Sequence, residues 1–170
     1  MGDLTSTEFG TVLLALRVIF GLVFAGHGWG KCKNGIDGTA GWFDSIGMKP
    51  GRVHALLASI TEIGAGLMLA AGLLTSFAAA GVVGVMAVAG YTSHRKNGFF
   101  IVKDGWEYTF IVALIAVSIA GLGPGKWSID SALSISDSLN GFVGLAIALV
   151  LGVGVGIAQL ALFYRPPAEA

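Results

Sequence analysis

The stretch MLAAGLLTSFAAAGVVGVMAVAG, residues 68–90, contains no charged side chain and decides the fold. Two apolar runs meet in it at Thr75 and Ser76. Because this link leaves room only for a tight turn, the two runs must be antiparallel neighbours. Each run approaches the ~20 apolar residues that cross a bilayer as a helix. The stretch therefore predicts a pair of membrane helices, Val53–Leu74 and Phe77–Ser93.

The composition of the whole chain indicates the same environment. Of 170 residues, 55% are hydrophobic and 12% are charged, about half the ~25% charge typical of soluble domains. Further spans are expected at Phe9–Trp29, Trp106–Leu122 and Leu139–Tyr164. We therefore expect an all-α, polytopic membrane helix bundle. A four-helix core would occupy residues 1–135, and a fifth C-terminal transmembrane helix with a short cytoplasmic tail would occupy residues 136–170.

Charge and cysteine content exclude several classes of function. Ten basic and ten acidic residues cancel, so no broad positive field exists for nucleic acid, which we exclude as a partner. The single cysteine rules out an internal disulfide or a site built from several thiolates. A metal site would have to come from His27, His94 and Glu107. No H-E-x-x-H or paired-cysteine spacing supports one, so no metal is expected.

Basic residues indicate the orientation in the membrane, because loops rich in Lys and Arg stay in the cytoplasm. Eight of them fall in the first loop, the third loop and the tail, against Lys126 alone in the opposite loops. We therefore expect the N-terminus outside and the C-terminus in the cytoplasm. The eight residues are Lys31, Lys33, Lys49, Arg52, Arg95, Lys96, Lys103 and Arg165.

The segment GTAGWFDSIGM, residues 38–48, is too short to span the membrane. Trp42, Phe43 and Ile46 would share one face of a helix in this segment, so it is expected to lie along the membrane surface. The alternative is an irregular loop, given its glycines.

Two charges lie within apolar segments, Arg17 in LLALRVIFG and Glu62 in ASITEIGAG. Exposing either to lipid costs at least ~2.5 kcal/mol, so each should face the bundle interior and find a partner. Their expected depths differ by ~6 Å, which a long arginine can close, so we predict a buried ion pair between them. The pair would either fix helix register or take part in proton or ligand handling.

Histidines mark the expected cytoplasmic ends of three spans. His27 ends the first, His54 begins the second and His94 closes the third. His54, beside Arg52, is interpreted as a solvated boundary residue. For the others we predict a polar, aromatic-lined vestibule with His27, Glu62, His94 and Glu107 as the catalytic candidates. The predicted quinone or ligand vestibule comprises His27, Trp29, Lys31, Trp42, Phe43, Phe99 and Trp106. An ordinary membrane interface is the alternative.

Small residues mark one face of the last predicted span. Gly152 and Gly156 in LGVGVGIAQ are one helical turn apart, which favours close helix packing or an oligomer contact.

An ordered series of motifs resembles the DoxX family of small bacterial integral membrane proteins. The motifs are RVIFGLVFAGHGWGKC, GTAGWFDSIGMKPG, TEIGAGLMLAAGLLT, HRKNGFFIVKDGWEYTF and GPGKWSID, which lie within Leu14–Asp130. The resemblance implies a four-helix core in the bacterial inner membrane. Its relatives include a subunit of a thiosulfate:quinone oxidoreductase and a member associated with a membrane oxidoreductase complex. The matching positions are Arg17, Gly21, His27, Gly28, Lys31, Glu62, His94, Asn97, Gly98, Phe99, Glu107, Pro124, Gly125 and Asp130.

These observations favour a membrane subunit of a quinone-linked or thiol-linked redox complex. The chain lacks recognisable motifs for a nucleotide, haem c or iron–sulfur cofactor, so quinone is the one cofactor considered, and other redox subunits are expected as partners. The alternative is a non-enzymatic accessory subunit that assembles a larger membrane complex. Transport is a third hypothesis, but no inverted repeat is evident in the sequence, which argues against it.

Overall fold

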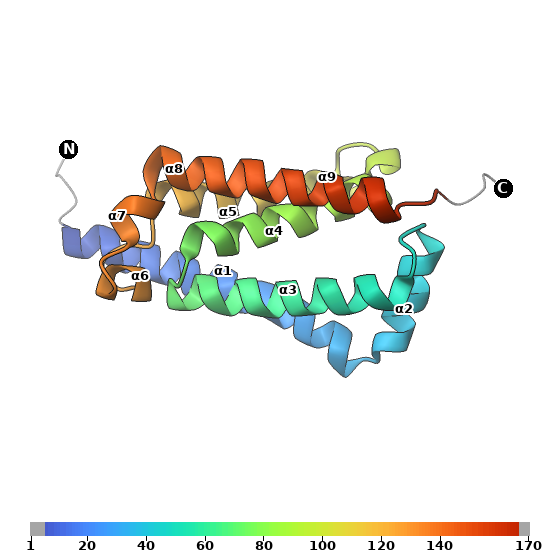
Figure 1. The fold of residues 1–170 in the computed structure, drawn as a ribbon, viewed down its shortest axis with the longest axis horizontal. Helices are drawn as coiled ribbons and strands as arrows, with labels where there is room; N and C mark the ends of the chain where they lie inside the picture. Colours follow the sequence, from blue (N-terminus) through green and yellow to red (C-terminus); the bar gives the residue numbers. More distant parts are fainter. Residues whose placement is uncertain (1–5, 167–170) are drawn as a thin grey trace.

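Long apolar helices run back and forth along one axis of the computed structural model, which describes residues 6–166 (Figure 1). The first helix begins at one end of this axis and the last helix finishes at the other. The long elements are α1 (Ser6–Lys33), α3 (Gly51–Ala71), α4 (Thr75–Ala89), α5 (Glu107–Leu122) and a rod of α8 (Gly141–Ala146), η4 (Ile147–Leu151) and α9 (Gly152–Phe163). The short ones are α2 (Ile36–Ser45), η1 (Gly90–His94), η2 (Arg95–Asn97), η3 (Ile101–Lys103), α6 (Ile129–Ala132) and α7 (Ser136–Leu139).

Four helices in the described part of the chain are long and apolar enough to cross a membrane. They are Thr7–Lys33, Gly51–Ala71, Thr75–Asn97 and Gly141–Phe163. Helix α5 has 16 residues and is about 24 Å long, short of a ~30 Å hydrocarbon core. The all-α membrane bundle is therefore confirmed with four spans. The fifth span, expected because Trp106–Leu122 was counted among the crossings, is not shown.

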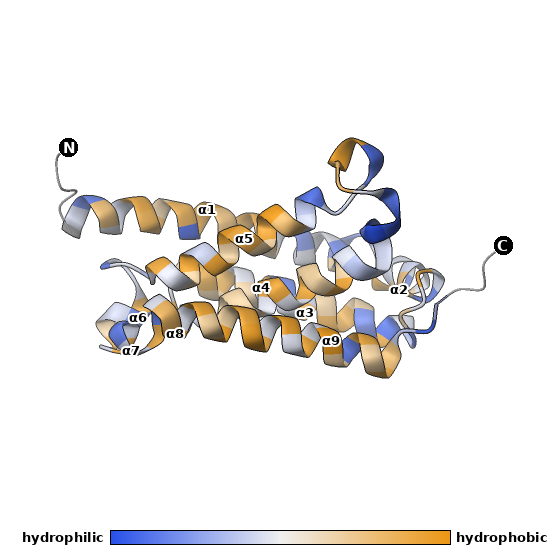
Figure 2. Cartoon of the chain, turned by 90° about the horizontal axis from the view of Figure 1, so that it is seen from above, coloured by the Kyte–Doolittle hydropathy of each residue, from blue (hydrophilic) through white to orange (hydrophobic). Residues whose placement is uncertain are grey.

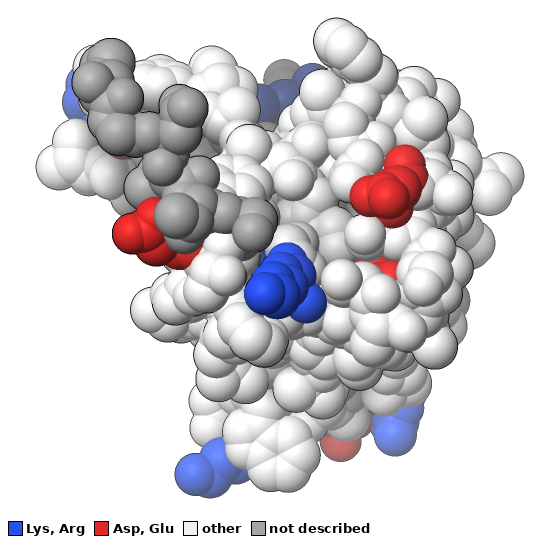
Figure 3. Space-filling model, turned by 90° about the vertical axis from the view of Figure 1, so that its left-hand side faces the viewer, with Lys and Arg blue, Asp and Glu red and all other residues white. Residues whose placement is uncertain are grey.

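Polar residues collect at the two ends of the bundle, and its middle is apolar (Figure 2). Most of the strongly hydrophilic surface lies at the end that holds α2, η2 and η3. The opposite end, where α1 begins, shows only scattered charges over a mostly uncharged face (Figure 3).

Close helix contacts depend on glycine. Helix α1 packs along α3, where a Cβ added at Gly66 would lie 2.5 Å from the carbonyl oxygen of Gly21. Helix α4 lies between α5 and the last rod. Gly152 and Gly156 are buried against α4, and a Cβ on Gly152 would lie 2.7 Å from the carbonyl oxygen of Ala80. These two glycines therefore pack within the chain.

The tight turn between α3 and α4 is held by a charge from a later loop. Asp130 is 1% exposed, and its carboxylate accepts hydrogen bonds from Leu74 N at 2.6 Å, Thr75 N at 2.9 Å and Thr75 Oγ1 at 2.8 Å. Its own backbone N–H donates to Gly72 O at 2.8 Å. A carboxylate at a helix N-terminus satisfies free amide groups and complements the helix dipole. The antiparallel pair predicted from residues 68–90 is thus closed by Asp130.

The segment predicted at residues 38–48 contains helix α2 rather than an irregular loop. Ala40 and Phe43 are buried against α3, and Trp42 is exposed. The chain end fastens the loop that follows α2, because Arg165 N donates to Gly47 O at 2.7 Å and Met48 pairs with Tyr164. Helix α2 is thereby fixed across the end of the bundle.

Candidate functional site

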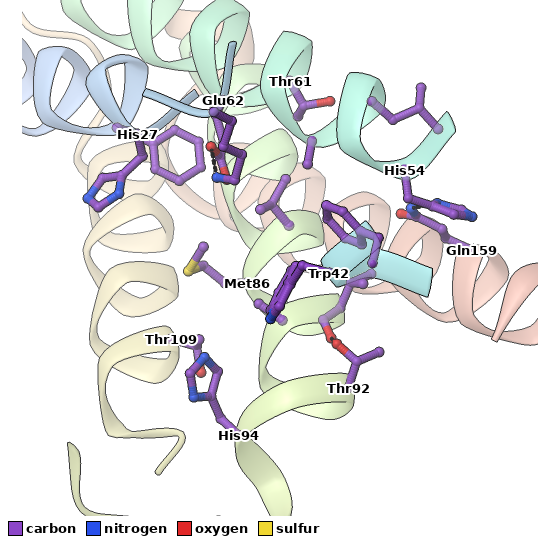
Figure 4. Close-up of a pocket in the computed structure, with 18 of the residues that line it drawn as sticks. His27, Trp42, His54, Thr61, Glu62, Met86, Thr92, His94, Thr109 and Gln159 are labelled. Atoms are coloured by element: carbon purple, nitrogen blue, oxygen red, sulfur yellow. Dashed lines mark hydrogen bonds and ion pairs between the residues drawn. The ribbon is translucent and has the colours of Figure 1, made fainter. Parts of the chain in front are cut away.

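A cavity of about 200 Å³ lies at the end of the bundle that α2 covers. Side chains from α1, α2, α3, α4, η1, α5 and α9 line it, so nearly every long element contributes (Figure 4). Its floor is apolar, formed by residues such as Phe24, Val85 and Met86. Polar groups enter from three sides. Figure 4 shows them as His27 with Glu62, His94 with Thr109, and His54 with Gln159.

The first polar side is an ion pair between Lys31 of α1 and Glu62 of α3. The Glu62 side chain is 6% exposed and the Lys31 side chain 26% exposed. Gly28 makes this possible, because its missing side chain lets α3 approach until the Glu62 Cβ would lie 2.9 Å from an added Cβ. A buried carboxylate requires such a partner, since an isolated charge is costly in an apolar bundle.

His27 extends this polar side toward α5. Its Nε2 lies 3.4 Å from the Tyr108 hydroxyl, and both residues line the cavity together with Lys31. The cavity therefore combines a cation, a carboxylate, an imidazole and a phenol within one wall. The ammonium, the phenol and the imidazole can donate hydrogen bonds to a bound carbonyl, and the carboxylate accepts one from the ammonium.

The second polar side depends on a widened helical turn. The α-helix of α4 gives way to the π-helical turn η1, which carries Thr92 and His94. Such turns occur frequently at functional sites because they re-aim side chains. His94 Nδ1 donates to Asp104 O at 2.8 Å and lies 3.5 Å from Asp104 Oδ1. Thr92, His94 and Thr109 all line the cavity.

The third polar side includes a residue that sequence analysis misjudged. His54 was expected to be solvated, yet it is fully buried, between the rings of Phe43 and Phe163. Gln159 Nε2 donates to its Nδ1 at 2.9 Å. Its Nε2 has no hydrogen-bond partner among the described residues. The error arose because Arg52 suggested an exposed helix start, whereas α2 and α9 cover it.

Of the predicted vestibule residues, the structure brings together His27, Lys31, Trp42, Phe43, Glu62 and His94. Trp29 is instead 64% exposed. Phe99 and Trp106 pack edge to face, with ring centroids 4.7 Å apart, and neither lines the cavity. Trp29 is near His27 in the sequence and Trp106 is next to Glu107, but this proximity did not predict which side chains line the cavity. A helix turns neighbouring side chains to different faces.

Glu107, a predicted catalytic residue, also lies outside the cavity lining. Its carboxylate accepts a hydrogen bond from Ile101 N at 2.8 Å, and its own N–H donates to Phe99 O at 2.8 Å. The side chain therefore shapes the loop between η2 and α5. The residue next to it, Tyr108, is the one that faces His27. The alternation of apolar and polar residues in GWEYTF, residues 105–110, could have indicated Tyr108 as the residue that faces His27.

The predicted ion pair between Arg17 and Glu62 is not formed. Arg17 is fully buried and donates to Leu69 O at 3.0 Å, Ala70 O at 3.2 Å and Trp127 O at 2.6 Å. Glu62 lies eight residues before Ala70 on α3, about 12 Å further along the helix and beyond the reach of Arg17. The depth estimate failed because the two helices are staggered, which brings Lys31 to the level of Glu62.

Metal-binding geometry is not present in residues 6–166, where no group of three or more His, Cys, Asp or Glu side chains comes together. Cys32 is exposed and does not line the cavity.

The fold and cavity define a multi-pass membrane protein with a polar pocket enclosed by its helices. The chain matches the DoxX family model over residues 12–95. It is 29% identical over 132 residues to the uncharacterized membrane protein Rv3486 of Mycobacterium tuberculosis, covering 72% of this chain and 81% of that protein. No solved structure matches the chain.

Proposed function

We propose that the chain is the membrane subunit of a redox complex and that its cavity holds a quinone headgroup. The observation that carries the proposal is one cavity in which the Lys31–Glu62 ion pair, the His27–Tyr108 contact and His94 all meet. Ionisable groups inside membrane bundles are costly and tend to be functional. The volume of about 200 Å³ is below the ~300–1,000 Å³ of pockets for drug-sized ligands, and suits a single ring.

The residues of the cavity fit the chemistry of such a ring. A bound quinone accepts two electrons and two protons to become a quinol. Lys31 and Tyr108 carry hydrogen-bond donors for a carbonyl oxygen, and the His27 imidazole offers ring nitrogens that can donate or accept a proton. Glu62 fixes the Lys31 ammonium in place. Trp42 and Phe43 supply apolar faces for the ring. Because the chain shows no electron-carrier motif, the electrons would come from a partner subunit.

The same proposal places the cavity at the cytoplasmic side of a bacterial inner membrane, with α5 as a fifth crossing. Helix α5 packs along α4, although it is short, with 16 residues. Lys31, Arg95 and most other basic residues fall at the cavity end, as expected for the cytoplasmic face. An odd number of crossings puts the chain termini on opposite sides.

Substitutions in the cavity test the proposal. The full-length protein in lipid nanodiscs would be titrated with a short-chain quinone, with quenching of Trp fluorescence as the signal. We expect His27→Ala and Lys31→Met each to weaken binding about tenfold, because each removes a polar contact worth ~1.5 kcal/mol. Tyr108→Phe should have a smaller effect in the same direction.

Matched controls come from the same elements. Lys33→Met removes a neighbouring exposed lysine, and Tyr91→Phe removes a phenol that lies outside the cavity. Both should bind quinone as the unaltered chain does. Equal affinity in all five variants would rule out the cavity as the quinone site.

A non-enzymatic accessory subunit is the second candidate. It is favoured by the Arg17 and Asp130 contacts, which serve packing at the end opposite the cavity. Under this function the cavity variants would leave the activity of a co-purifying complex unchanged. Under the redox function, His27→Ala lowers quinone-dependent turnover at least about tenfold.

A further inference from the structure

A groove of about 600 Å³ lies on the outside of the bundle, between α4, α5 and the rod η4–α9. Its walls are apolar along most of their length, with Ala113 and Val117 from α5 and Leu149 and Val153 from the rod. These helices present apolar side chains on the outside of a membrane protein, so the groove opens toward lipid. Its position is separate from the polar cavity, although Met86 and Thr109 line both.

One end of the groove is polar and positively charged. The Arg95 guanidinium lies 3.8 Å from the centroid of the Tyr91 ring, and both residues line the groove together with Trp106. Within residues 6–166, the side chain of Arg95 makes no ion pair and no hydrogen bond. Its five N–H donors therefore face the surroundings in a position fixed by the aromatic ring.

The length of the groove corresponds to one leaflet. From Trp106 to Val117 is eleven residues of α5, about 16 Å at 1.5 Å per residue. From Val83 to Arg95 is twelve residues of α4, η1 and η2, about 18 Å. Half of a ~30 Å hydrocarbon core is about 15 Å. An extended chain anchored at the interface beside Arg95 would therefore fill the groove as far as the middle of the membrane.

We propose that this groove binds one anionic phospholipid, with an acyl chain against Ala113 and Val117 and the phosphate at Arg95. Charge complementarity selects the headgroup, because arginine presents paired donors that match phosphate oxygens. Lys96 and Lys103 lie in the same loop but do not line the groove. The inference does not depend on the quinone proposal, since it concerns a different surface.

Native mass spectrometry tests the site on the full chain. The protein would be reconstituted in equal parts of phosphatidylglycerol and phosphatidylcholine, released in detergent, and scored for retained lipid. The unaltered chain should retain one phosphatidylglycerol in preference to phosphatidylcholine. Arg95→Gln should lower that preference about fivefold, because it removes the paired donors to the phosphate, whereas Lys96→Gln, outside the groove lining, should leave it unchanged.

A second variant fills the groove directly. Ala113→Phe should abolish retention of the lipid, whereas Ala161→Phe, at an exposed position of α9, should retain it. Equal losses in Arg95→Gln and Lys96→Gln would show a diffuse positive field instead of a site. Retention of no lipid, of a quinone, or of a second copy of the chain would each overturn the phospholipid assignment. Only the quinone result would at the same time support the proposed function.

Discussion

At the scale of single residues, two buried charges neutralise the ends of two consecutive helices. Arg17 donates to carbonyl groups of Leu69 and Ala70, at the C-terminus of α3, where backbone acceptors are left free. Asp130 accepts from the amide groups of Leu74 and Thr75, at the N-terminus of α4. The charge signs complement the helix dipoles. These residues are therefore costly in lipid but stabilising in the folded bundle.

Asp130→Asn tests this arrangement. The amide removes the negative charge while retaining one acceptor oxygen, so we expect the free energy of unfolding to fall by about 2 to 3 kcal/mol, the range for hydrogen bonds to a charged group. Thermal unfolding in detergent, followed by circular dichroism, measures the change. The control is Asp137→Asn in the exposed first turn of α7, which should shift the midpoint little. Equal shifts in both variants would contradict a special role for Asp130.

At the scale of elements, the contact between α1 and α3 sets the position of the cavity wall. The helices approach most closely at Gly21 and Gly66, and again where Gly28 meets Ser59 and Glu62. Backbones that approach this closely gain dispersion contacts, a main source of helix association in lipid. The same approach brings Glu62 within reach of Lys31. Packing and site geometry are therefore coupled.

Two glycines of α3 provide a matched pair for testing that coupling. A Cβ at Gly66 would lie 2.5 Å from Gly21 O, whereas one at Gly64 would meet nothing within 4 Å. Gly66→Ala should lower the free energy of unfolding by more than about 1 kcal/mol, because the backbones must separate. Gly64→Ala should raise it by up to about 1 kcal/mol through helix propensity.

Chemical denaturation of both variants under one set of conditions gives the comparison. If Gly66→Ala proved as stable as Gly64→Ala, the close approach of α1 and α3 would not be a determinant of stability.

At the scale of the whole molecule, the rods alternate in direction and leave the start of α1 and the end of α9 at opposite ends of the bundle (Figure 1). Most basic residues, among them Lys31, Arg52 and Arg95, fall at the end of the bundle that holds the cavity. Positive loops remain cytoplasmic. The proposed topology therefore has five crossings, of which the short α5 is one.

Reporter fusions measure this topology. Alkaline phosphatase is active outside the inner membrane and green fluorescent protein is fluorescent inside. An N-terminal phosphatase fusion and a C-terminal fluorescent fusion should both give signal, and the exchanged pair should give none. If both termini reported from the same side, α5 would not be a crossing. The side assigned to one of the two termini would then be wrong.

The sequence predicted the helices well because hydropathy alone determines where a chain can cross lipid. The pairing of the two spans around Thr75 followed from the short link. Most of one cavity wall, including His27 and Lys31, also followed, because those residues end a span. The partner of Arg17 could not be predicted, since stagger between helices and backbone acceptors are not visible in a hydropathy pattern. His54 was misjudged because only the fold shows that α2 and α9 cover it.

The contacts of Arg17 impose an order on biogenesis. Its acceptor Trp127 follows it by 110 residues in the chain, so the ribosome delivers the first helix long before the loop that completes its burial. The Arg17 guanidinium gains its first acceptors when the end of α3 is translated and its last acceptor only after the intervening helices have been made. The burial of Arg17 is therefore complete only when the loop before α6 emerges.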